Sequence, residues 1–198
     1  MLVLGLTGSV GMGKSTVAAM FAEKGVAAFD ADATVHALYR GAAVPLVEAS
    51  FPGTMIDGAI DRKKLADKVI DNPSAIAKLE AIVHPLVREA ENSFRAHVAG
   101  EGRRIALLDI PLLLETGGQS RVDAVVLVSA TSEIQEARVL ARPGMTRERL
   151  DAILRRQMPD DEKRRRAHFI VDTGGDFVET RRQVDDVLRA VAGMAAGH

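Results

Sequence analysis

The chain of 198 residues is long enough for one domain with a buried core, and its 47% apolar and 27% charged residues argue against intrinsic disorder. The net charge of −1 leaves no basic excess for binding a nucleic acid, and the absence of cysteine excludes disulfides and thiolate metal sites. No segment has the apolar length of a membrane span or the pattern of a signal peptide, so we expect a cytoplasmic protein.

The first 32 residues predict a strand, a glycine-rich loop, a helix and a second strand. Leu2–Leu6 is a short apolar run, and Val26–Phe29 is a second one. Between them, three apolar residues share one helical face: Val17, Met20 and Phe21. Gly25 is expected to end this helix. The order is that of a βαβ unit, which requires a parallel sheet with a right-handed crossover.

The loop between this strand and helix carries the pattern Gly-x-x-x-x-Gly-Lys-Ser. Its glycines let successive backbone N–H groups point at phosphate oxygens, next to the positive end of a helix. Lys14 is expected to reach the β- and γ-phosphates, and the Ser15 hydroxyl to bind Mg²⁺. The expected nucleotide contacts are Gly8, Ser9, Val10, Gly11, Met12, Gly13, Lys14, Ser15 and Thr16. The sequence therefore predicts ATP and Mg²⁺ as cofactors.

Two aspartates, Asp30 and Asp32, follow the second strand at its carboxyl end, where open α/β sheets bind ligands. A carboxylate in this place could accept the proton of an attacking hydroxyl or help to hold the metal ion. Asp32 is favoured as the reactive group. Asp30 could equally be the N-cap of the following helix, and the alternative that both residues only cap stays open.

More than 70 residues separate the second strand from the third, too many for one crossover. Apolar residues in this stretch recur at helical spacing: Leu79, Ile82, Val83, Leu86, Val87, Ala90 and Phe94. We therefore expect a helical insertion over residues 32–102, in which Pro85 starts or kinks a helix. His84 is either a polar contact to the acceptor or a structural histidine.

Three more buried strands are predicted at Ile105–Leu108, Ala124–Val128 and Phe169–Val171, followed by a closing amphipathic helix over residues 176–194. The first of these ends in Asp109, which is typical of the aspartate that holds Mg²⁺ in P-loop proteins. Glu115 could line the acceptor pocket or form a structural ion pair. The predicted core thus comprises residues 1–31, 103–130 and 167–198 around a five-stranded parallel sheet.

Residues 131–166 form a second predicted insertion, helical and rich in arginine. Ten basic and five acidic residues lie between positions 138 and 166. Arg138 and Arg142 are four apart on one helical face, where guanidinium groups could neutralise charge on a transferred phosphoryl group. A mobile lid carrying them would also exclude water. The alternative is a solvated face, which is favoured for Arg164–Arg166 but not for Arg142.

The motifs together resemble those of the dephospho-coenzyme A kinase family nearly end to end. The residues that carry the resemblance are Leu6-Thr7-Gly8, Asp30-Ala31-Asp32, Asp61-Arg62-x-x-Leu65, Leu79-Glu80-x-Ile82-x-His84-Pro85, Asp109-Ile110-Pro111-Leu112-Leu113-x-Glu115, Gln135-x-x-Arg138-x-x-x-Arg142 and Gln157. The departures from the family pattern include Ser9 and Met12 in the glycine-rich loop, and Val171-Asp172-Thr173-Gly174 where the family has Asn-x-Gly near the adenine.

The resemblance implies an α/β P-loop fold of three layers with an acceptor-binding insertion and a lid. It implies transfer of the ATP γ-phosphoryl group to the ribose 3′-hydroxyl of dephospho-coenzyme A, the last step of coenzyme A synthesis. Asp32 would be the general base and Lys14 the phosphate ligand. The lid would supply Arg138 and Arg142, and the acceptor side would comprise His84, Arg88 and Glu115.

The rival interpretation is another small-molecule P-loop kinase, such as a nucleoside monophosphate kinase, which shares the core and the lid. A GTPase would need a guanine-reading Asn-Lys-x-Asp, which is absent from the sequence. The expected partner is therefore a small-molecule acceptor, with no nucleic acid and no membrane. The sequence does not reveal the oligomeric state, although a monomer is favoured.

Overall fold

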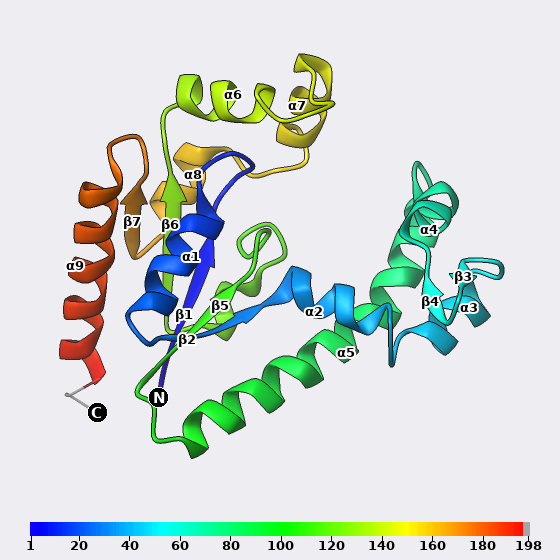
Figure 1. Ribbon diagram of the computed structural model, residues 1–198, viewed down its shortest axis with the longest axis horizontal. Coiled ribbons are helices and arrows are strands. Elements are labelled where there is room, and N and C mark those ends of the chain that lie inside the picture. Colours follow the sequence, from blue (N-terminus) through cyan, green and yellow to red (C-terminus); the bar gives the residue numbers. More distant parts are fainter. Residues whose placement is uncertain (196–198) are drawn as a thin grey trace. The chain divides into compact units, whose positions relative to one another are not determined.

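The computed structural model describes residues 1–195 and divides them into two compact units (Figure 1). The first unit, here called the core unit, comprises residues 1–29 and the chain from residue 98 onward. The second, here called the insertion unit, comprises residues 30–97. No helix in the described range has an apolar stretch long enough to cross a membrane.

The core unit contains a parallel sheet in the order β2-β5-β1-β6-β7. Its strands are β1 Leu2–Thr7, β2 Ala27–Asp30, β5 Ile105–Asp109, β6 Ala124–Ser129 and β7 Phe169–Asp172. The central strand β1 pairs in parallel with both β5 and β6, and β6 pairs in parallel with β7. The predicted five-stranded parallel sheet is therefore confirmed, with each strand within a residue or two of its predicted position.

Helices cover the sheet because alternate strand residues face opposite sides. The helices of this unit are α1 Lys14–Glu23, α6 Ser132–Leu140, α7 Arg147–Leu154, α8 Asp160–Arg166 and α9 Phe177–Ala195, with a short 3₁₀ turn η1 at Gly118–Arg121. One face packs on α1 and α9 through a large apolar cluster that includes Leu4, Leu6, Phe21 and Val187. The other face packs on the segment after β5, with Leu113 and Leu114 against β6.

The insertion unit is mainly helical, as predicted, but it also contains a small hairpin. Its elements are α2 Ala31–Leu38, α3 Val44–Ser50, β3 Met55–Ile56, β4 Ala59–Ile60, α4 Arg62–Val69 and most of α5 Pro73–Gly100. Asp57 and Gly58 both have positive φ between the two short antiparallel strands, which is the geometry that an Asp-Gly hairpin turn requires. This hairpin was not predicted, although the Asp-Gly pair signals it.

Helix α5 runs without a break through Pro85, so of the two expectations for this residue, a helix start or a kink, the helix start is wrong. The helix begins twelve residues earlier, where the Asn72 side chain accepts a hydrogen bond from the N–H of Ala75 at 3.1 Å. Pro73 then occupies the first helical position, where a missing N–H removes no helical hydrogen bond. Pro85 costs the helix the bond that a residue in its place would donate to the carbonyl of Ala81, and its ring also crowds that carbonyl.

Candidate functional site

The glycine-rich loop joins β1 to α1 at the carboxyl edge of the sheet. Gly13 is the N-cap of α1 with a φ of 87°, and it offers no side chain to the first turn. A Cβ atom on Gly8 would lie only 2.6 Å from the carbonyl oxygen of Val128, so a larger residue cannot occupy this position. The free N–H groups at the start of α1 can therefore receive the oxygens of a phosphate.

Two glutamines of the arginine-rich segment hold the outer end of the loop. The backbone N–H of Val10 donates to Gln157 Oε1 at 3.2 Å, and Gln135 Nε2 donates to the Val10 carbonyl at 2.7 Å. Gln135 is 7% exposed, so this amide contact is shielded from water. The two peptide groups that flank the Val10 Cα are thus both held by side chains from outside the loop.

Lys14 and Asp109 form an ion pair between the loop and the end of β5. The exposed fractions of their side chains are only 16% and 8%, so the pair lies in a largely dry environment. Ser15 lies in the exposed first turn of α1. A hydroxyl and a carboxylate are hard oxygen donors of the kind that Mg²⁺ uses together with substrate phosphates, so Ser15 and Asp109 fit the predicted metal.

Two residues that depart from the family pattern contact each other in the structure. The Thr173 hydroxyl donates to the carbonyl of Met12 at 2.8 Å, and Thr173 is almost fully buried. Arg138 donates to the Thr173 hydroxyl at 2.9 Å and to its carbonyl at 2.6 Å. Met12 in turn accepts the N–H of Ala130 on its sulfur at 3.1 Å. The end of β7, helix α6 and the glycine-rich loop are therefore joined through one threonine.

A cavity of about 430 Å³ lies within the core unit beside the loop. Its lining includes the loop, the two candidate lid arginines and the start of α9: Gly11, Gly13, Thr16, Arg138, Arg142 and Phe177. Arg142 is exposed and forms no ion pair with any described residue. In contrast, Arg166 pairs with Glu162 at the surface of α8, as the solvated-face alternative expects. Arg164 departs from that alternative, because it pairs with Asp160 and also donates to the buried Ser129 hydroxyl at 2.7 Å.

Glu115 faces a buried lysine that no sequence motif singles out. Lys163 is 0% exposed, and its Nζ lies 2.7 Å from Glu115 Oε1. The contact is an ion pair between two largely buried side chains. Glu115 Oε1 also accepts the N–H of Met158 at 3.1 Å. These contacts favour the structural interpretation of Glu115, because they connect the segment after β5 to α8.

The two aspartates after β2 have different environments in the insertion unit. Asp30 is the N-cap of α2, and its Oδ1 accepts the N–H of Ala33 at 2.8 Å. Asp32, in the first turn of the same helix, is exposed and has no hydrogen-bond or ion-pair partner among the described residues. Only Asp32 is therefore available to a substrate without loss of an existing contact.

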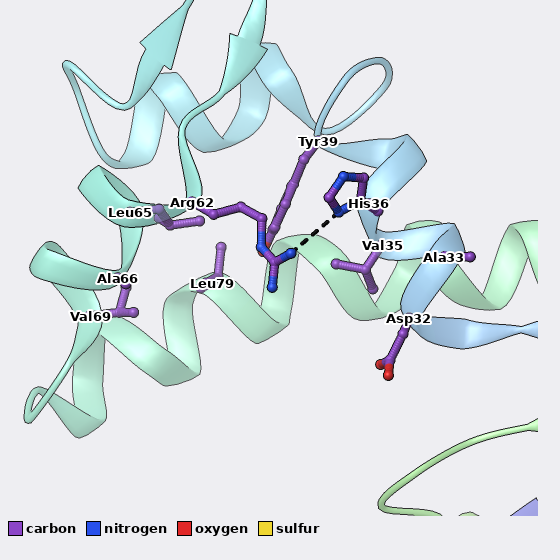
Figure 2. A pocket seen from close by; sticks show the side chains of 10 residues that line it. All are labelled: Asp32, Ala33, Val35, His36, Tyr39, Arg62, Leu65, Ala66, Val69 and Leu79. Atoms are coloured by element: carbon purple, nitrogen blue, oxygen red, sulfur yellow. Dashed lines mark hydrogen bonds between the residues drawn. The ribbon is translucent and has the colours of Figure 1, made fainter. Parts of the chain in front are cut away.

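A second cavity, of about 650 Å³, lies entirely within the insertion unit (Figure 2). It is lined by faces of α2 and α4 and by Leu79 of α5, and Asp32 is part of its lining. His84 and Arg88 are one helical turn apart on the exposed side of α5 and do not line this cavity. Of the three residues predicted for the acceptor side of this unit, this cavity therefore includes Asp32 alone.

Comparison with known proteins shows similarity over nearly the whole chain. Residues 2–179 match the profile of a protein family described as dephospho-CoA kinase. The dephospho-CoA kinase of Brucella abortus is 58% identical over 196 residues, which are 99% of this chain and 98% of that protein. The crystal structure of TT1252 from Thermus thermophilus has a TM-score of 0.86 at 35% identity and covers 96% of both chains. The dephospho-CoA kinase from Campylobacter jejuni has the same fold, with a TM-score of 0.73 at 24% identity over 96% of each chain.

Proposed function

The chain belongs to the dephospho-CoA kinase family, and we propose that it transfers the γ-phosphoryl group of ATP to the ribose 3′-hydroxyl of dephospho-coenzyme A. The products are coenzyme A and ADP. The observation that carries the proposal is a complete glycine-rich phosphate loop in a chain that resembles these kinases from end to end.

The core unit would bind the nucleotide. The loop N–H groups and Lys14 would hold the phosphates, and the 430 Å³ cavity would take the rest of ATP. Ser15 and Asp109 would hold Mg²⁺, which when bound neutralises charge on the phosphate oxygens. Lys14 would exchange its contact with Asp109 for one with the phosphates, so the ion pair keeps the ammonium group in place for its ligand.

The acceptor hydroxyl would lose its proton to Asp32. This assignment is supported by the exposure of Asp32 and by its lack of a partner, whereas Asp30 already caps α2. A carboxylate is a suitable general base when it lies within hydrogen-bond reach of the attacking hydroxyl. The hydroxyl oxygen then bonds to the γ-phosphorus as the bond to the β-phosphate oxygen breaks, and ADP leaves with that oxygen.

Residues 131–166 would act as the lid and supply positive charge to the transferred group. Arg142 is the stronger candidate for this contact because it lines the cavity and has no ion-pair partner in the described range. Arg138 would act beside it, and in the present structure it holds Thr173 and through it the loop. His84 and Arg88 stay proposed acceptor contacts, since their shared exposed face on α5 could receive an anionic ligand.

The proposed setting is the cytoplasm, with a monomer acting on a small-molecule acceptor. The test is a phosphotransfer assay with purified protein, ATP and Mg²⁺ and a panel of acceptors that includes dephospho-coenzyme A and AMP. We expect coenzyme A with its new phosphate on the 3′-oxygen, identified by mass spectrometry and ³¹P NMR. Faster phosphorylation of AMP than of dephospho-coenzyme A would instead support a nucleoside monophosphate kinase.

A further inference from the structure

The 650 Å³ cavity of the insertion unit is built from two helix faces with the same spacing. Positions 32, 35 and 36 of α2 and its C-cap at 39 line the cavity together with Ala33, and on α4 positions 62, 65, 66 and 69 do so. Residues spaced by three and four lie on one side of a helix, so both helices present a continuous stripe to the cavity. The α4 stripe is apolar except at Arg62, and the α2 stripe is polar at Asp32, His36 and Tyr39.

Three polar side chains, Arg62, His36 and Tyr39, meet in the middle of this lining. Figure 2 shows Arg62 reaching from α4 toward α2, where its Nη1 lies 3.4 Å from His36 Nδ1, with Tyr39 beside it. Burial raises the pKa of Tyr39, and the nearby charge of Arg62 opposes that effect only in part, so the phenol stays protonated. Arg62 forms no ion pair with any carboxylate of the described residues, so its positive charge is unpaired at the cavity surface.

The same three residues also line a second, adjoining cavity of about 310 Å³. This second cavity continues past them toward Arg40 and the hairpin residues Ile56, Ala59 and Ile60, and it does not include Asp32. His36, Tyr39 and Arg62 therefore line both cavities, and the candidate base Asp32 lines only the larger one. A ligand that fills both must be elongated, with a hydroxyl near one end and negative charge in its middle.

We propose that His36, Tyr39 and Arg62 bind the 5′-diphosphate of dephospho-coenzyme A. The adenosine would occupy the larger cavity, with its 3′-hydroxyl at Asp32, and the pantetheine chain would enter the smaller one. Asp32 and His36 are one helical turn apart, about 5–6 Å between Cβ atoms, which is the scale of the single ribose that separates these two groups of the ligand. The proposal rests on the proposed function and adds to it the residues that select the acceptor.

Charge and geometry both favour an anion of this kind. An arginine without a carboxylate partner can donate two parallel hydrogen bonds to phosphate oxygens. The apolar α4 residues beside Arg62 would contact the uncharged parts of the ligand. One face of α4 would then bind both the diphosphate and the uncharged groups next to it.

The test compares Arg62→Gln with the matched control Lys63→Gln, which removes the same charge from an exposed position that lines neither cavity. We expect Arg62→Gln to raise the KM for dephospho-coenzyme A about 10–100-fold, as loss of a hydrogen bond to a charged group does. Its kcat/KM for adenosine, which lacks the diphosphate, should stay within about twofold of wild type, and Lys63→Gln should change neither value. Equal losses with both acceptors, or the same loss in the control, would overturn the proposal.

A second readout separates this proposal from the proposed function. Dephospho-coenzyme A is titrated calorimetrically into wild type, Arg62→Gln and Arg62→Lys without ATP, beside a thermal melt of each variant. Weaker binding by Arg62→Gln, with partial recovery in Arg62→Lys, supports the diphosphate site even if no phosphoryl transfer is found. Unchanged affinity in a folded Arg62→Gln variant overturns the site even if wild type makes coenzyme A.

Discussion

The nucleotide loop and the acceptor cavity hold their polar groups in different ways. In the core unit, Val10 is bound by two glutamines, the Met12 carbonyl by Thr173, and Lys14 by Asp109. In the insertion unit, Asp32 has no partner in the described range, and Arg62 has only the imidazole of His36. The loop is thus fixed by tertiary hydrogen bonds, whereas the acceptor side relies on helix geometry to aim exposed side chains.

This difference has a consequence for how substitutions act. Groups that are fixed before binding lose little entropy when the substrate arrives, so their removal is expected to affect the transition state and the shape of the loop together. Exposed groups without partners can be exchanged with little effect on stability, so their removal should affect turnover or affinity alone. The predictions below test this contrast, beginning with the largest effect.

The largest expected effect is on the acceptor side, at Asp32. Asp32→Asn keeps the shape of the side chain but removes the proton acceptor, and loss of a general base costs about 10²–10⁴-fold in rate. We expect kcat to fall by that amount with ATP affinity and melting temperature little changed. Asp30→Asn is the matched control, because it keeps the N-cap oxygen of α2 and removes only the charge, which should lower stability slightly and leave turnover nearly unchanged. A dead Asp30→Asn beside an active Asp32→Asn would reverse the assignment.

Lys14 tests the fixed side of the comparison. Lys14→Ala removes the charge that would contact the β- and γ-phosphates, and we expect activity to fall at least about 100-fold. Because Asp109 loses its buried partner in the same variant, stability should fall as well, unlike in Asp32→Asn. Steady-state kinetics and a urea titration give both values. Near-normal turnover in the folded variant would contradict the assignment of the phosphate loop.

The buried pair of Lys163 and Glu115 tests whether Glu115 belongs to the framework or to the acceptor. Lys163→Met leaves a mostly buried carboxylate without its cation, which costs about 3–5 kcal/mol when one partner of a buried pair is removed. The double variant Lys163→Met with Glu115→Gln should recover much of this loss in chemical denaturation. If the folded double variant had a greatly raised KM for dephospho-coenzyme A, Glu115 would be an acceptor contact after all.

Arg142 distinguishes catalysis from binding within the lid. Arg142→Ala is expected to lower kcat about 10–100-fold, because a hydrogen bond to a charged group contributes roughly 1.5–3 kcal/mol. The KM for the acceptor should change less, since the charge of Arg142 is needed most while the phosphoryl group moves. Arg155→Ala, in the same lid segment, is the control for general loss of charge. An unchanged kcat with a raised acceptor KM would make Arg142 a binding residue.

The smallest expected effect concerns Glu48, which holds the loop before the hairpin of the insertion unit. Backbone hydrogen bonds from Gly53 and Met55 lower the pKa of this carboxyl from its ordinary value of 4.5. When the pKa of a carboxyl is lower in the folded state, its ionised form stabilises the fold at pH values above the unfolded-state pKa. This contribution is lost as the pH falls through the folded-state pKa. Glu48→Gln should therefore melt slightly below wild type at pH 7, with no difference at strongly acid pH. A difference that persists there would exclude ionisation as the cause.

Much of the fold and part of the site follow from local patterns in the sequence. The strands of the sheet, the helix after the loop and the closing helix all appear as apolar runs or helical periodicity within short windows. The glycine-rich loop is equally local, because the glycines and Lys14 lie within eight consecutive residues. These features are determined by neighbouring residues, so the sequence alone could predict them.

Contacts between distant residues were decided only by the tertiary structure. Thr173 meets Met12 across 161 positions of the chain, and Gln157 meets Val10 across 147. Lys163 lies in a strongly charged helix whose sequence suggests only a solvated face, yet its side chain is fully buried against Glu115. The sequence predicts no role for His36, and only the tertiary structure places it beside Arg62. Which polar groups meet depends on how whole elements pack, and no local pattern of residues records that.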